Sequence, residues 1–128
     1  MLMAAPLAAA DAANHQYIEA GRLIDSIAGT TTQGQCIEVR GERIVAVAPC
    51  GPTPAGAQRI DWSAYTVVPG LIDLHTHVYW GGTSLGVEAE LLARTGGVTT
   101  FIDAGSAGPG NFHGFRKHVI EPSPVRIL

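Results

Sequence analysis

The residue pattern changes at Pro69-Gly70, and this change limits the folds that the chain can adopt. Before it, short stretches of apolar and β-branched residues alternate with polar ones and are separated by turns rich in glycine and proline, which is typical of β-strands. We expect strands at residues 17–23, 35–40, 43–48, 60–61 and 66–68. Residues 14–68 are therefore predicted to form a partial β-sandwich module, too small to close on itself.

After this point, strand-like and helix-like segments alternate. The pattern predicts strands over 71–78, 98–104 and 125–128, and helices over 84–95 and 112–121. This order is typical of an α/β fold, in which uniformly apolar strands form a parallel sheet with both faces covered. A (β/α)8 TIM barrel needs eight such strands and typically about 250 residues. If the fold is a barrel, residues 69–128 are the N-terminal part of a TIM barrel, truncated after at most three strands; a doubly wound sheet is the alternative that the same order of elements allows.

Composition excludes several classes of protein. The 128 residues are 46% hydrophobic and carry a formal net charge of −3, which favours a packed core over disorder. We expect no nucleic-acid or membrane partner, because the chain has no excess of basic residues. Residues 1–13 resemble either the end of a secretory signal or a disordered leader. A periplasmic or secreted location and a cytoplasmic one both remain open.

The chain contains two cysteines, Cys36 and Cys50, on either side of a predicted hairpin. If Arg40 pairs with Arg43, the cysteines are three residues out of register, roughly 10 Å apart at about 3.3 Å per residue. Because a disulfide needs a much closer approach, we predict two free thiols.

The strongest chemical signal is the segment Asp73-Leu74-His75-Thr76-His77. Residues two apart in a strand share a face, so Asp73, His75 and His77 are predicted to point to one side. We predict that this strand is buried and that both imidazoles enter one cavity. Two imidazoles at the carboxyl end of a barrel strand can hold one metal ion, with Asp73 orienting a ligand from behind. Two histidines at this spacing are also common as ordinary polar residues.

Several segments resemble the amidohydrolase superfamily. They are PGLIDLHTH at 69–77, like the first barrel strand, GERIVAV at 41–47, like the preceding hairpin, and GVTTFIDAG at 97–105, like the second strand. Residues 79–86 and 103–108 resemble the dihydroorotase-like deacetylase branch of that superfamily. The resemblance extends over roughly residues 17–128 and implies a hydrolase of amide or acyl bonds in small molecules.

The resemblance also implies a binuclear metal centre, usually zinc. Superfamily members bind one metal ion through the histidine pair, which corresponds to His75 and His77. A carboxylated lysine bridges the two ions, and two later histidines and a late aspartate complete the set. None of these later groups has a counterpart here, because the chain's single lysine, Lys117, lies in the second predicted helix. Two protein ligands leave a zinc site incomplete.

Several other polar and aromatic residues are candidates for a functional or a structural role. Tyr79 and Trp80 follow the histidine strand, where they could line a substrate pocket or pack in the core. Asp103 ends the second barrel-like strand; we expect it to accept backbone N–H groups of the Gly105–Gly110 loop, with a catalytic role as the alternative. The remaining histidines are assigned to a solvated helix face or to the leader: His113, His118 and His15.

Two functions remain open. The chain is either the N-terminal part of a deacetylase-like amidohydrolase, inactive alone because the later ligands are absent, or a non-catalytic remnant that acts as a binding module. A remnant would need a partner to cover its strand edges, because bare edges aggregate.

Overall fold

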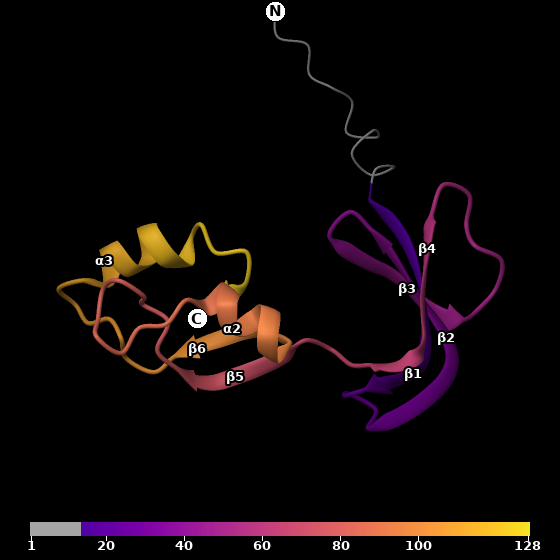
Figure 1. The fold of residues 1–128 in the computed structure, drawn as a ribbon, viewed down its shortest axis with the longest axis horizontal. Helices are drawn as coiled ribbons and strands as arrows, with labels where there is room; N and C mark the ends of the chain where they lie inside the picture. Colours follow the sequence, from indigo (N-terminus) through magenta and orange to yellow (C-terminus); the bar gives the residue numbers. More distant parts are fainter. Residues whose placement is uncertain (1–13) are drawn as a thin grey trace, which may run out of the picture. The chain divides into compact units, whose positions relative to one another are not determined.

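The computed structural model describes residues 14–128, which form two compact units with a boundary between Pro69 and Gly70 in the sequence (Figure 1). The signal-like leader predicted at residues 1–13 lies outside the described residues. Among the helices that are described, none is long and apolar enough to cross a membrane.

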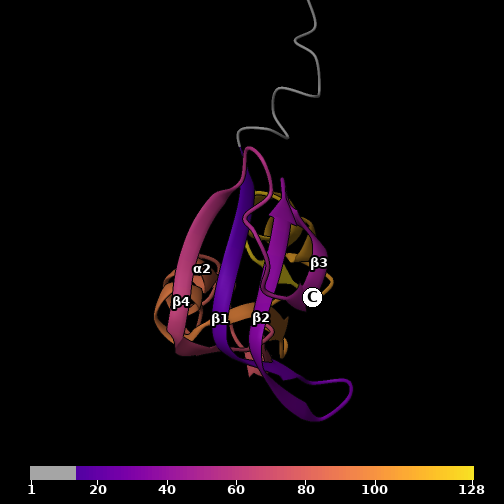
Figure 2. The ribbon, with the colours of Figure 1, turned by 90° about the vertical axis from the view of Figure 1, so that its right-hand side faces the viewer.

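The first unit is a four-stranded sheet with strand order β3-β2-β1-β4, seen face-on in Figure 2. Its strands are β1 (His15–Asp25), β2 (Thr30–Arg40), β3 (Arg43–Pro49) and β4 (Gln58–Val67). β1 pairs antiparallel with β2 and β2 with β3, whereas β1 and β4 are parallel. β3 and β4 are the edge strands of this sheet, and the partial β-sandwich stays a prediction.

β4 is one long strand where two short ones were predicted. Its pairing with β1 shifts register around Gly21, and the Asp61 carboxylate accepts the backbone N–H of Ser63 at 2.9 Å. An aspartate that accepts a backbone N–H two residues further on is typical of a turn, so the sequence wrongly predicted an interruption between two strands. A Cβ atom on Gly21 would lie 2.0 Å from the Ser63 carbonyl oxygen, so only glycine permits this close approach.

The prediction of two free thiols is wrong. Cys36 and Cys50 form a disulfide, with their Cα atoms 4.8 Å apart. Arg40 does pair with Arg43, but a β-bulge then shifts the register by one residue and places Cys36 opposite Ala48. Cys50 follows Ala48 by two residues, so both cysteines lie on the same face of the hairpin as diagonal neighbours.

The second unit is a three-stranded parallel sheet with strand order β5-β6-β7 and helical segments between the strands. Its elements are β5 (Leu71–Thr76), α2 (Ala89–Gly96), β6 (Val98–Asp103), α3 (Phe112–Phe115), the π-helical turn η1 (Arg116–Ile120) and β7 (Arg126–Ile127). The buried cluster consists of Val78, Ala89, Phe101, Phe115, Val119 and Ile127. The predicted alternation of strands and helices is confirmed, and the eight-stranded barrel stays a prediction.

Two local predictions for this unit are wrong. β5 is parallel to β6 but is not buried: Leu71, Ile72 and Leu74 are 52%, 60% and 75% exposed. The reason is that β5 is an edge strand, with β6 as its only neighbour among the described strands. Helix α2 begins at Ala89 rather than at residue 84, because residues 79–86 form tight turns.

Candidate metal centre

His75 and His77 lie where β5 passes into its following loop. Their ring centroids are 5.7 Å apart and the ring planes are inclined by 78°, so both imidazoles lie on one side, as predicted. The His75 side chain is exposed and that of His77 is half-buried. If two imidazole nitrogens each lie about 2 Å from one zinc ion, tetrahedral geometry places the ring centres roughly 5 Å apart. The observed separation is therefore close to what a shared ion requires.

The donor chemistry suits zinc, but the number of donors is too small. Within residues 14–128, no group of three or more His, Cys, Asp or Glu side chains is arranged to hold a metal ion. The two imidazoles would fill half of a tetrahedral shell. Asp73 contacts this segment through the backbone: its carboxylate accepts the N–H of His75 at 3.0 Å.

The ring of His77 has a polar contact on one side. Its Nδ1 lies 3.2 Å from the Ser106 hydroxyl oxygen, in the loop that follows β6. Its backbone carbonyl accepts the N–H of Val87 at 2.9 Å, which fixes the local chain direction. The remaining ring nitrogen, Nε2, is the one that this arrangement leaves for a ligand. Sequence reasoning missed Ser106, although the pattern Asp-Ala-Gly-Ser is typical of an Asp-headed turn.

Asp103 connects the ends of β5 and β6. One carboxylate oxygen accepts the N–H of Val78 at 2.9 Å, and the other accepts those of Gly105 at 3.0 Å and Ser106 at 2.6 Å. Burial raises the pKa of Asp103, but the hydrogen bonds from Val78, Ser106 and Gly105 together outweigh it and lower the pKa below its usual value. The expected role in holding the Gly105–Gly110 loop is confirmed.

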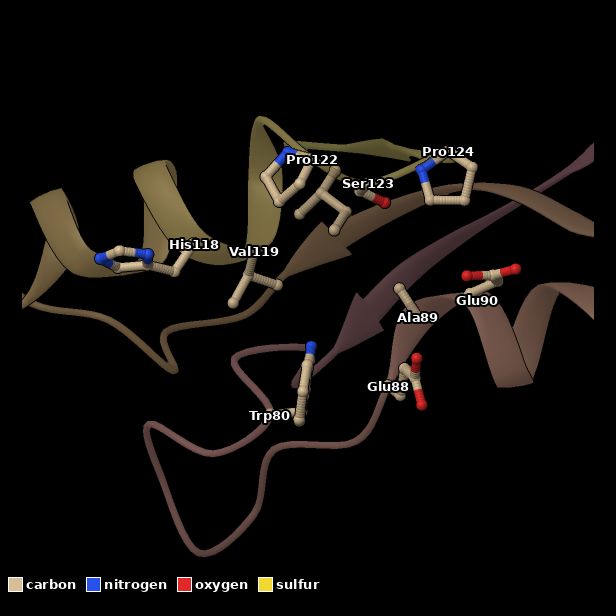
Figure 3. A pocket seen from close by; sticks show the side chains of 10 residues that line it. Trp80, Glu88, Ala89, Glu90, His118, Val119, Pro122, Ser123 and Pro124 are labelled. Carbon is tan, nitrogen blue, oxygen red and sulfur yellow. The ribbon is translucent and has the colours of Figure 1, made fainter.

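Two cavities lie in the second unit, and the three candidate pocket residues relate to them differently. Trp80 lines a cavity of about 190 Å³ together with residues of α2 and η1 (Figure 3). Asp103 lines a second cavity of about 380 Å³. Tyr79 stacks on Phe115 with ring centroids 4.7 Å apart, an ordinary packing contact. Neither of these two cavities is lined by His75 or His77, and the cavity predicted to receive both imidazoles stays a prediction.

The other histidines lie away from this pair. His15 does not belong to a leader: it begins β1, and its Nε2 lies 2.9 Å from Glu38, which Arg40 also contacts. His113 and His118 are exposed on the α3–η1 segment, as expected for a solvated helix face. His118 also contributes to the cavity that Trp80 lines.

Comparison with known proteins gives consistent matches. A deacetylase of Agrobacterium fabrum is 47% identical over 85 residues, which are 66% of this chain and 21% of that protein. A dihydroorotase of Streptococcus thermophilus is 32% identical over 95 residues, 72% of this chain and 22% of the relative. The crystal structure of a dihydroorotase matches with a TM-score of 0.71 and 34% identity, covering 88% of this chain and 29% of that one. The chain thus spans about a fifth of the length of these curated relatives. No family model matches it.

Proposed function

We propose that this chain, which belongs to the dihydroorotase-like amidohydrolases, supplies the first two metal ligands of a hydrolase that cleaves non-peptide carbon–nitrogen or acyl bonds. The partial coverage of the relatives fits an N-terminal portion. We assign catalysis to a longer protein in which an eight-stranded barrel is complete, and we expect the 128-residue chain to be inactive alone.

One observation carries the proposal: two imidazoles with ring centroids 5.7 Å apart lie at the carboxyl end of a parallel strand. Active-site groups of α/β barrels lie at the carboxyl ends of the strands. His75 and His77 would hold a divalent ion, with zinc as the first choice because imidazole nitrogen is among its preferred ligands. Such an ion would polarise a scissile carbonyl and lower the pKa of bound water to about 7.

The residues of this chain would bind the first metal ion and orient the groups around it. The two imidazoles would hold the ion, and Asp103 fixes the end of β5 relative to the loop after β6 by accepting the backbone N–H groups of Val78 and Ser106. The second ion and its bridging lysine would come from later parts of the barrel. We propose a small amide, N-acyl or O-acetyl compound as the substrate, and no nucleic acid or membrane, since the net charge is −3.

Metal binding tests the proposal on the 128-residue chain itself. We expect weak zinc binding, measured by competition with a chromogenic chelator, that is lost in His75→Ala and in His77→Ala. The control is His113→Ala, which removes an exposed histidine of the same unit and should leave the affinity unchanged. Equal affinity in all three variants would show that the zinc binds elsewhere.

Hydrolysis tests the assignment of activity. The chain with added zinc should release no acetate from N-acetyl or O-acetyl substrates above background. A complete protein that contains this chain should lose turnover to background when His75 or His77 becomes alanine. Metal-dependent turnover by residues 1–128 alone would show that the later ligands are not needed.

A further inference from the structure

We propose that Ser106, whose backbone N–H is held by Asp103, is a positioning residue for His77: its hydroxyl accepts the Nδ1–H of the imidazole and so directs the Nε2 lone pair towards the metal ion. This inference rests on the proposed function, because it assigns His77 as a ligand. It adds a residue on a different strand–loop segment, 29 positions further along the chain.

The geometry fixes the two partners relative to each other. The Ser106 hydroxyl oxygen lies 3.2 Å from Nδ1 of His77, in a partly buried position. The Asp103 carboxylate accepts the backbone N–H of Ser106 at 2.6 Å and that of Val78, the residue after His77, at 2.9 Å. One carboxylate therefore holds both the serine and the backbone next to the imidazole, so the ring–hydroxyl contact does not depend on a free loop.

The direction of the proton follows from what each group can do. The Ser106 hydroxyl can either donate to or accept from Nδ1 of His77, which it faces at 3.2 Å. A neutral His77 that binds an ion through Nε2 must carry its proton on Nδ1, and the Ser106 oxygen is the group placed to accept that proton. The neutral ring in this tautomer has its lone pair on Nε2, as a metal ligand requires.

The opposite tautomer of His77 would leave the ring unprepared to bind a metal ion through Nε2. With the proton on Nε2, the ring's lone pair would be on Nδ1, which already faces Ser106 at 3.2 Å. The ring could then not bind an ion through its free nitrogen without losing a proton. The tautomer of His77 in the metal-free chain therefore distinguishes a positioning serine from one that only packs against the ring.

Nitrogen NMR of the histidine-labelled, metal-free chain measures this tautomer directly. The spectra are to be recorded at about pH 8. We expect His77, assigned by comparison with His77→Ala, to carry its proton on Nδ1 in the wild type and in Ser106→Thr. Ser106→Ala should shift the population towards Nε2–H, and Ser84→Ala, an exposed serine of the same unit, should change nothing. A wild-type ring protonated on Nε2 would overturn the proposal without any variant.

Zinc affinity separates this inference from the proposed function. We expect Ser106→Ala to weaken zinc binding about 10- to 100-fold, as loss of a ligand-orienting partner does, and Ser106→Thr to restore it. If zinc binds through His75 and His77 but Ser106→Ala changes neither tautomer nor affinity, the positioning role fails and the metal site stands. If the wild type binds no zinc, the proposed function fails, and the NMR result alone decides whether Ser106 sets the tautomer.

Discussion

The two units hold their strands together by different means. The first has strands of up to eleven residues and a disulfide, yet large apolar side chains remain exposed on it, among them Ile44, Trp62 and Tyr65. The second has shorter strands and a cluster of side chains around Phe101, which is fully buried. A covalent link therefore supplements backbone pairing in the first unit, whereas in the second a buried cluster joins strands and helical segments. Because the imidazole pair belongs to the second, its placement should depend on the packed cluster and be insensitive to the disulfide.

The largest effect should come from removing the central side chain of that cluster. Phe101→Ala should cost about 3–5 kcal/mol of unfolding free energy, since it deletes a fully buried phenyl group and leaves a cavity. This is comparable to the whole stability of a small domain. We expect amide hydrogen exchange to show loss of protection in β5 and β6 and little change in β1 and β2.

The matched control is Phe112→Ala in the same unit, because this side chain is 47% exposed. It should cost much less and leave zinc binding intact. If Phe101→Ala instead removed protection from β1 and β2 as well, the two units would not be independent, and the comparison between them would fail.

A smaller effect, confined to the first unit, should follow loss of the disulfide. The double variant Cys36→Ser/Cys50→Ser opens a link between residues 14 positions apart. Chain entropy predicts a loss of about 3 kcal/mol for a loop of roughly 15 residues. Thermal unfolding should show a lower Tm for β1–β4 signals, and reductant should lower the wild type to the same value while leaving the variant unchanged.

Zinc affinity tests whether loss of the disulfide affects the candidate metal site. We expect the double variant to bind zinc as the wild type does, because every proposed ligand and its supports lie in the second unit. A tenfold loss of zinc affinity on reduction would show that the sheet of the first unit contributes to the site.

The sequence predicts the order of elements well and their register poorly, for a physical reason. Alternation of apolar and polar residues fixes the register of a strand only where one face is buried. All seven residues of β3 are exposed, so its sequence contains no signal for the bulge at Val45. That one extra residue turns an expected separation too large for a bond into the Cys36–Cys50 disulfide.

In the candidate site too, the features set by neighbouring residues could be predicted from the sequence, whereas the contacts between distant residues could not. The shared side of His75 and His77 follows from the two-residue period of a strand, and the structure agrees. The contact of His77 with Ser106 joins residues 29 positions apart and depends on how the β6 loop folds over Asp103. Periodicity contains no such information, and only the Asp-headed turn had a local signature.

The smallest effect concerns a charge cluster in the first unit. Glu38 accepts hydrogen bonds from Arg40 and from His15, and these contacts lower its pKa from the usual 4.5, against the opposing effect of burial. A pKa that is lowered on folding stabilises the folded state above the unfolded-state pKa, and this stabilisation is lost as the pH falls through the lowered value. Glu38→Gln should therefore reduce the Tm of the first unit slightly at about pH 7, by less than disulfide loss does.

The pH dependence separates charge from packing in this variant. The difference in Tm between wild type and Glu38→Gln should shrink as the pH falls below about 4.5, because protonated glutamate and glutamine are both neutral. Glu42→Gln, in the exposed hairpin turn, is the control and should show no comparable pH-dependent difference. A difference that stays constant down to about pH 3 would mean that Glu38 stabilises β1 and β2 through shape and hydrogen bonding alone. In that case backbone pairing and the disulfide, without a contribution from charge, would account for how the first unit differs from the second.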